Sequence, residues 1–335
     1  MIVENVQFRK LMKEFREEGL LEVSNAKGAT TVFVELAVFA LLCWGLASVE
    51  AFGLWFWVIQ ILAGCSLFRW FVILHECGHK TLFRASMTNS VVGHVASVLC
   101  LVPYIPWRNI HMQHHRWVGV IDKDPTQKHL LNLQKASEVQ NRLFRIVWKL
   151  WLPIPFAMFL FEVFWGYPVA MLKEKRTKDA WKGAGSVLVC VLGQLLAIEA
   201  LGLKGWATYF LPMLAVFYFL IENMNLPQHS ELFPYLSDTH PDPIPFSAQD
   251  DITRSTHLPD WISTVLALNF NRHTEHHMFA TAPWYSLNEI RRRLLREGYE
   301  FPHEVEFVHF MWELRQRDPL TIYRDALPKS SDAAQ

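Results

Sequence analysis

Charged side chains are scarce in this sequence of 335 residues. They make up only 19% of the chain, and the 32 basic residues balance the 32 acidic ones, so the formal net charge is zero. Typical soluble domains carry about a quarter charged residues. A neutral chain without a long basic run is also poorly suited to nucleic acid. The composition therefore predicts a membrane protein that does not bind nucleic acid.

Paired cysteines are missing as well. The five cysteines lie singly, with no C-x-x-C pair, and most fall in apolar stretches, so we expect small core residues and no disulfide framework. The first 28 residues are too charged for a cleavable signal. The spacing of Phe8, Leu11, Met12 and Phe15 predicts an amphipathic N-terminal arm. Such an arm lies either on the membrane surface or against the protein itself.

Long apolar runs are what the sequence has in abundance. Hydrophobic residues make up 51% of it, with 24 Phe and 14 Trp. A membrane-spanning helix needs about 20 mostly apolar residues. Four runs approach that length, at about 30–49, 51–74, 184–201 and 205–222. They predict an all-α integral membrane protein with two transmembrane hairpins. The remaining segments are expected to form interfacial helices and a helical cap.

Basic residues predict the orientation of these spans. Lys and Arg gather in the N-terminal arm, in 173–182 and in an amphipathic helix at 286–297, whereas the two short turns carry only Lys204. Basic loops stay on the cytoplasmic side. Both termini are therefore expected to face the cytoplasm.

Fifteen histidines form the most unusual pattern. Eight of them fall in three pentapeptides, which we call boxes 1, 2 and 3: His75-Glu-Cys-Gly-His79, His111-Met-Gln-His114-His115 and His273-Thr-Glu-His276-His277. Spacings of three and four place side chains on one helix face. A ninth, His229, follows the fourth apolar run directly, as box 1 follows the second.

Nine converging imidazoles predict a site for two metal ions. Imidazole suits iron, copper, nickel and zinc, and nine rings are too many for one ion. All nine must then lie on one side of the membrane. Crossings between the boxes must be even in number, so the apolar stretches 90–106 and 147–171 are expected to lie in the interface or to dip in and return.

These motifs resemble the membrane fatty acid desaturase and hydroxylase superfamily over residues 50–290. The three boxes stand in the family's order, and Trp107-Arg108, Asp122 to Pro125 and Met278-Phe279 to Pro283-Trp284 also fit. The resemblance implies a di-iron oxidase that uses O2 and two electrons to desaturate a fatty acyl chain in a lipid. Because the sequence contains no H-P-G-G haem motif, electrons are expected from a separate carrier of cytochrome b5 or ferredoxin type.

The resemblance also implies the metal ligands and the domain limits. The implied ligands are His75, His79, His111, His114, His115, His229, His273, His276 and His277. Asn225, four residues before His229, is implied to contact a metal through water. We expect an arm at 1–28, a desaturase-like domain at 29–290 and a cytoplasmic C-terminal helix and tail at 291–335.

Supporting residues are sought among the neighbours of the boxes. A ligating imidazole commonly donates its second N–H to a carboxylate or carbonyl. Asp122, Asp124, Asn269 and His257 are the candidates for such contacts, and ordinary surface or packing roles are the alternative for each.

Two other functions fit parts of the pattern. A carotenoid or lipid hydroxylase or ketolase shares the same boxes, because ligand type alone does not choose between removal of a second hydrogen and transfer of oxygen. Box 1 also satisfies H-E-x-x-H, the motif of zinc proteases, with Glu76 as the base between His75 and His79. The protease interpretation leaves boxes 2 and 3 unexplained.

Overall fold

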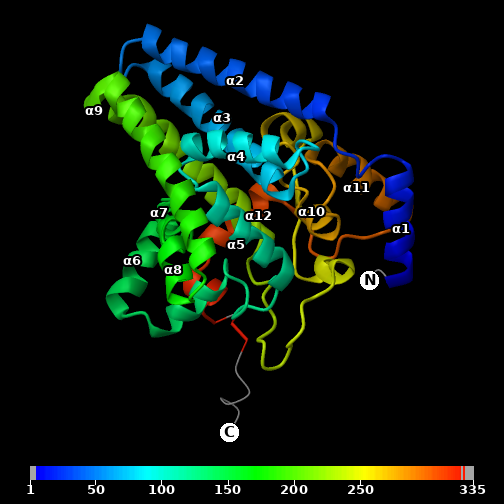
Figure 1. Ribbon diagram of the computed structural model, residues 1–335. Coiled ribbons are helices and arrows are strands. Elements are labelled where there is room, and N and C mark those ends of the chain that lie inside the picture. The colour runs from blue at the N-terminus through cyan, green and yellow to red at the C-terminus, as the bar shows by residue number, and fades with distance from the viewer. Residues whose placement is uncertain (1–4, 326, 329–335) are drawn as a thin grey trace.

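Figure 1 shows a computed structural model of the protein, in which residues 5–325 and 327–328 are described. Across these residues the chain is mostly helical and contains almost no strand. The strands among them are β1 (Thr256–His257) and β2 (Val305–Glu306), which pair in parallel and join two distant loops.

The first hairpin consists of α2 (Asn25–Ser48) and α3 (Leu54–His79), which run side by side along one edge of the molecule (Figure 1). Both are long and apolar enough to cross a membrane. The most apolar window of α3 is 61% buried against 17% for α2, so α3 is the central helix. It continues past the predicted span to His79, which makes box 1 helical.

The second hairpin lies within α9 (Thr177–His229), which breaks at Gly202. Gly202 has φ of 70°, a conformation that glycine adopts without a steric penalty. The Trp206 indole nitrogen donates a hydrogen bond of 2.8 Å to the Gln194 side chain. Twelve residues of straight helix would separate these two by about 18 Å. The chain therefore reverses at the predicted turn, and the return half packs along α3, where the Gln60 amide donates to the Tyr209 carbonyl.

The two ambiguous apolar stretches form sharply bent helix pairs. The angle is 102° between α4 (Ser86–Cys100) and α5 (Tyr104–Trp117), and 120° between α6 (Glu138–Lys149) and the segment of α7 (Ile154–Phe159) and η2 (Leu160–Trp165). Pro103 and Pro153 are the N-cap residues that directly precede the second helix of each pair, where the missing N–H is tolerated. The expectation that neither stretch crosses the membrane alone stays a prediction.

A cap of short helices covers the ends of α3, α5 and α9. It comprises η1 (Lys128–Lys135), α8 (Tyr167–Lys173), η3 (Phe246–Asp251), η4 (Ile262–Leu266), α10 (His273–Met278), η5 (Trp284–Ser286), α11 (Leu287–Arg296), α12 (Phe307–Gln316) and α13 (Pro319–Tyr323). α12 is fixed to α9 by Arg315, whose guanidinium is fully buried and lies 2.7 Å from the Glu222 carboxylate.

The N-terminal arm packs on this cap. Its helix α1 (Asn5–Glu17) places the rings of Phe8 and Phe15 at 5.3 and 5.0 Å from the ring of Phe279, just after α10. Glu14 also pairs with Arg293 of α11. Of the two placements that the sequence left open for the arm, the structure therefore shows contact with the protein.

Candidate metal centre

All nine predicted histidines come together at the ends of four helices. Box 1 ends α3, box 2 occupies the second half of α5, box 3 forms α10, and His229 ends α9. Their ring nitrogens form two separate groups, within each of which the ligand atoms lie no more than 4.8 Å apart. The five-histidine group contains His75, His79, His111, His115 and His276, and the four-histidine group contains His114, His229, His273 and His277.

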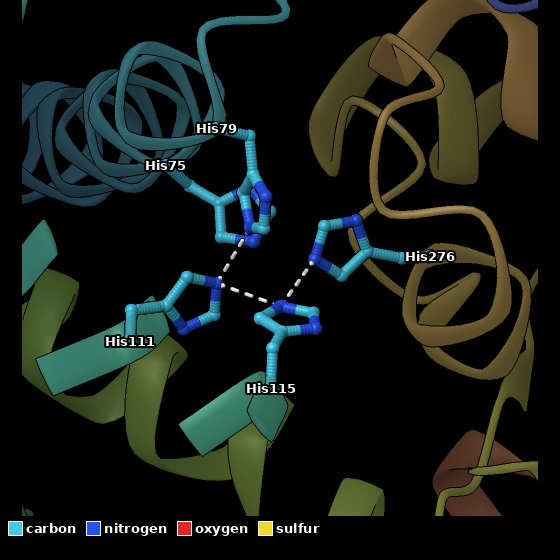
Figure 2. Close-up of side chains that lie close together, drawn as sticks. All are labelled: His75, His79, His111, His115 and His276. Atoms are coloured by element: carbon cyan, nitrogen blue, oxygen red, sulfur yellow. Dashed lines mark hydrogen bonds between the residues drawn. The ribbon is translucent and has the colours of Figure 1, made fainter. Parts of the chain in front are cut away.

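The five-histidine group is drawn in Figure 2, where rings from α3, α5 and α10 point toward one another. The Nε2 atom of His111 lies 2.8 Å from that of His79 and 3.1 Å from that of His115. The Nε2 atom of His276 lies 3.1 Å from that of His115. His75 Nε2 is buried and has no hydrogen-bond partner among the described residues.

The four-histidine group has the same construction around His229. Its Nε2 atom lies 3.1 Å from that of His114 and 2.7 Å from that of His273. His277 Nε2 is buried without a partner in the described chain. Two nitrogens that bind one ion at about 2.1 Å lie about 3 Å apart when they subtend a right angle. The spacing in both groups therefore fits nitrogens that share an ion.

Boxes 2 and 3 each contribute histidines to both groups, but the group that receives the outer pair differs between the two boxes. The two outer histidines of box 2, His111 and His115, belong to the five-histidine group, and the outer pair of box 3, His273 and His277, belongs to the four-histidine group. The inner histidine of each box crosses to the other group. Residues four apart lie on one helix face, whereas adjacent residues diverge by about 100°. The H-x-x-H-H pattern thus places ligands in two neighbouring sites.

Five of these imidazoles are buried in surroundings that favour the neutral form, which binds metals. Burial lowers the pKa of His111, His115, His273, His276 and His277 well below the ordinary value, and the neighbouring histidines lower it further. A cluster of this kind would repel itself if protonated. Its nitrogen lone pairs are therefore available to a cation.

The Nδ1 atoms of His114 and His277 contact side chains from other segments. Asp124, which is fully buried, lies 2.7 Å from His114 Nδ1, and the Thr126 hydroxyl lies 3.0 Å from the same atom. The Gln249 side-chain oxygen lies 2.9 Å from His277 Nδ1. Such contacts fix the orientation of the ring and the tautomer of a ligating histidine. Asp124 was a candidate from the sequence, whereas Thr126 and Gln249 were missed.

The remaining candidates lie elsewhere. Asp122 accepts hydrogen bonds from the backbone and hydroxyl of Ser237, so it holds a loop. Asn269 bonds to Asn288 and to the Trp284 carbonyl. His257 is exposed in β1. The side-chain hydrogen bonds of Asp122 and Asn269 described here therefore go to partners other than the box histidines.

Asn225 lies one turn before His229 on α9, as the spacing requires. Its side-chain amide donates a hydrogen bond of 2.8 Å to the Ile221 carbonyl of its own helix. A water-mediated contact between Asn225 and a metal stays a prediction.

Glu76 occupies a place that the sequence did not reveal. Its carboxylate lies 3.2 Å from His75 Nδ1 and accepts hydrogen bonds from the Thr81 hydroxyl and the Trp284 backbone. It therefore sits on the outer side of the His75 ring, opposite the Nε2 atom. A protease base must reach the metal-bound water instead, so this placement does not favour the zinc protease interpretation.

Gln249 could not have been found by spacing. It lies in η3, within the Pro- and Asp-rich loop, and its amide also donates to the backbone carbonyls of His115 and Ile244. Its role depends on how this loop folds back over α5. Thr126 could have been suspected from the sequence, because it directly follows the segment Asp122 to Pro125, which contains the candidate Asp124.

The region that contains these histidines matches a known protein family. Residues 52–309 match the fatty acid desaturase family, a region that contains all three boxes and His229. A sn-1 oleoyl-lipid 12-desaturase of Picosynechococcus sp. is 24% identical over 333 residues, which cover 92% of this chain and 87% of the relative.

Two further relatives come from a plant and a cyanobacterium. The omega-6 fatty acid desaturase, endoplasmic reticulum isozyme 2, of Glycine max is 28% identical over 77% of this chain and 70% of its own. A sn-1 acyl-lipid omega-3 desaturase (ferredoxin) of Nostoc sp. is 24% identical over 75% of this chain and 69% of its own. The similarity therefore extends well beyond the boxes.

Proposed function

This chain belongs to the fatty acid desaturase family of oxidoreductases, and from that premise we propose that it is a membrane-bound di-iron enzyme that introduces a double bond into a fatty acyl chain of a lipid. The relatives named above act on acyl lipids or fatty acids, and their names describe desaturation and not hydroxylation. They favour desaturation over the hydroxylase or ketolase alternative.

The observation that carries this proposal is the division of nine imidazoles into two adjacent groups. Imidazole nitrogen is a suitable ligand for iron. Two irons held there would supply the O2-dependent oxidising chemistry, using two electrons, that removes hydrogen from an unactivated methylene.

The protein's part in this reaction is to orient the ligands and to exclude water. The Trp107 ring stacks on that of His111, with the ring centres 4.5 Å apart. Gly78 makes this possible, because a Cβ atom there would lie 2.5 Å from the Trp107 ring. The Phe270 ring closes the opposite side of His75 at 5.4 Å. These contacts pack aromatic rings against the histidines of the five-histidine group.

We further propose that the four segments of the two hairpins each cross the membrane. In this arrangement the basic arm, both termini and the metal centre face the cytoplasm. A separate electron-transfer protein of cytochrome b5 or ferredoxin type then approaches from that side. The ferredoxin named for the Nostoc relative supports a partner of this kind.

The direct test is expression of the full chain in a host that lacks fatty acid desaturation. Total fatty acids are measured by gas chromatography and mass spectrometry, with His277→Ala as the control, and iron is measured on the purified protein. We expect a new alkene in lipid acyl chains and two irons per chain. A hydroxylated or oxidised lipid with unchanged fatty acids would support the hydroxylase alternative and overturn the proposal.

Glu76→Gln separates the oxidase from the protease. The histidines remain, so an oxidase variant is expected to retain iron and part of its product. A protease variant would lose all of its chemistry, because its general base is gone.

A further inference from the structure

An open groove of about 510 Å³ lies on the outer surface, away from the histidines. One wall is formed by Ile154 and Met158 of α7 and Phe161 of η2, and the other by Ala215 and Tyr218 on the return half of α9. Almost all of its lining is apolar. Because α9 is long and apolar enough to cross a membrane, this groove opens at a depth where lipid chains surround the protein.

Tyr218 lines the groove, but its hydroxyl is buried beneath the groove surface. Its side chain is only 8% exposed, and its hydroxyl has no hydrogen-bond partner among the described residues. Burying a hydroxyl without a partner costs free energy. This hydroxyl does not reach the groove surface, so a ligand there meets mainly apolar side chains.

The helix that leads into the groove has the pattern of an interfacial helix. On α6, Val139, Leu143, Ile146 and Leu150 form one exposed apolar stripe, while Trp148 on the opposite face is buried in the cap. Arg142 and Lys149 are exposed beside this stripe. Apolar residues flanked by cations suit the boundary between acyl chains and lipid phosphates. The mouth of the groove therefore lies next to a surface that matches lipid headgroups.

The groove is connected to the metal centre by packed side chains. Its helix α7 also carries Phe159, whose ring lies 5.0 Å from that of His129. Burial lowers the pKa of His129 to about 4, and the nearby Asp124 carboxylate acts in the opposite direction. Asp124 in turn holds His114 of the four-histidine group.

The far wall gives a second connection. Along α9, Tyr218 precedes His229 by eleven residues, or about 16 Å of helix. Glu222 lies between them and accepts a hydrogen bond of 3.2 Å from the Phe156 backbone, which fixes α7 to α9. Both walls of the groove thus lead toward the four-histidine group.

We propose that this groove is the lateral portal by which an acyl chain, still attached to a bilayer lipid, reaches the metal centre from the membrane. The inference rests on the proposed function, since it assigns a route to that substrate. The exposed Glu162 carboxylate on the groove wall disfavours the like charge of a free fatty acid. The ligand is therefore an uncharged chain whose headgroup stays in the interface.

Ala215→Trp tests the portal, because Ala215 is exposed and an indole there would fill the groove without entering the core. The matched control is Ala37→Trp, which adds the same ring to the exposed face of α2. Both full-length proteins are placed in phosphatidylcholine membranes in which one acyl chain carries a photoactivatable diazirine. Crosslinked peptides, bound iron and acyl products are then measured on each.

In the wild type and in Ala37→Trp, crosslinks are expected on α7, η2 and the return half of α9. Ala215→Trp should lose at least about 10-fold in crosslinking and in product while it keeps its iron. Unchanged crosslinking and product in Ala215→Trp would overturn the portal. So would normal product from a water-soluble acyl thioester with no product from the lipid.

Crosslinking also separates this inference from the proposed function. If the wild type makes no alkene but still crosslinks in the groove, desaturation fails as the function while the lipid site stands. If it makes alkene but Ala215→Trp has no effect, the function stands and the portal fails. An Ala215→Trp protein that has lost its iron is replaced by Ala215→Leu, with the same expected direction.

Discussion

The two histidine groups differ in where their ligands come from. The five-histidine group takes two rings from the central, largely buried helix α3 and two from α5. The four-histidine group takes none from α3 and relies on α10, on one ring of α5 and on the end of α9. Its supporting acceptors, Asp124 and Gln249, come from loops. One site is therefore built into the hairpin core, while the other depends on how the cap folds over it.

This difference suggests that the two groups differ in how many coordination positions they leave open and in how strongly they depend on the cap. A group with four nitrogen ligands leaves more of an ion's coordination positions open than a group with five. Loop-based support also makes the four-histidine group more sensitive to changes in the cap. We expect substitutions outside the spans to act on this group first.

The largest effect should come from replacing either of two adjacent histidines of α10 by alanine. His276→Ala and His277→Ala remove adjacent residues that serve different groups. Each should lower product by at least about 100-fold and metal content from two ions to one per chain. Elemental analysis with Mössbauer spectroscopy of iron-57 protein should show a different iron missing in each variant. Identical spectra from the two would break the comparison.

An intermediate effect is expected at the carboxylates that follow box 2. Asp124→Asn weakens the partner of His114, so metal affinity or activity should fall by about 10–100-fold through the four-histidine group. Asp122→Asn is the matched control, since Asp122 binds Ser237. Metal titration and product assays compare the two variants. Equal losses would mean that the loop as a whole matters more than the contact with the histidine.

The smallest effect on chemistry should come from the N-terminal arm. Phe15 is fully buried against Phe279, so Phe15→Ala should cost about 3–5 kcal/mol in the free energy of unfolding. Val6→Ala on the exposed face is the control, with a change within about 0.5 kcal/mol.

Thermal unfolding in detergent, followed together with iron content, measures both arm variants. Because the arm packs at the end of α10, iron loss in Phe15→Ala should begin at the four-histidine group, which takes two rings from α10 against one for the other group. Preferential loss from the five-histidine group would contradict this reasoning.

Helical spacing made the convergence of the nine histidines predictable from the sequence, but not their distribution over two groups. Apolar runs located both helical hairpins, and the break at Gly202 falls between the predicted runs 184–201 and 205–222. Helices α3 and α9 extend beyond the predicted apolar runs and end at His79 and His229, because a helix can continue through polar residues that an apolar run excludes. The assignment of His114 and His276 to opposite groups depends on how α5 faces α10, which is a matter of tertiary packing that spacing cannot encode.

Loop residues and the arm show why the rest escaped prediction. A carboxylate near a box has many possible partners, so Asp122 and Asp124 looked equivalent although only one contacts a histidine. The apolar stripe of α1 has the same periodicity whether it covers lipid or protein. Which of these it covers is decided by Phe279, more than 260 residues away.

The crossing of the inner histidines has a consequence for assembly of the holoenzyme. Since α5 and α10 each reach both cavities, capture of a first ion freezes the two helices that the second ion also needs. The second ion then binds to side chains that are already ordered, so its binding costs the protein less conformational entropy. Loading should therefore be cooperative, with fewer half-filled molecules than two independent sites would give when iron is limiting.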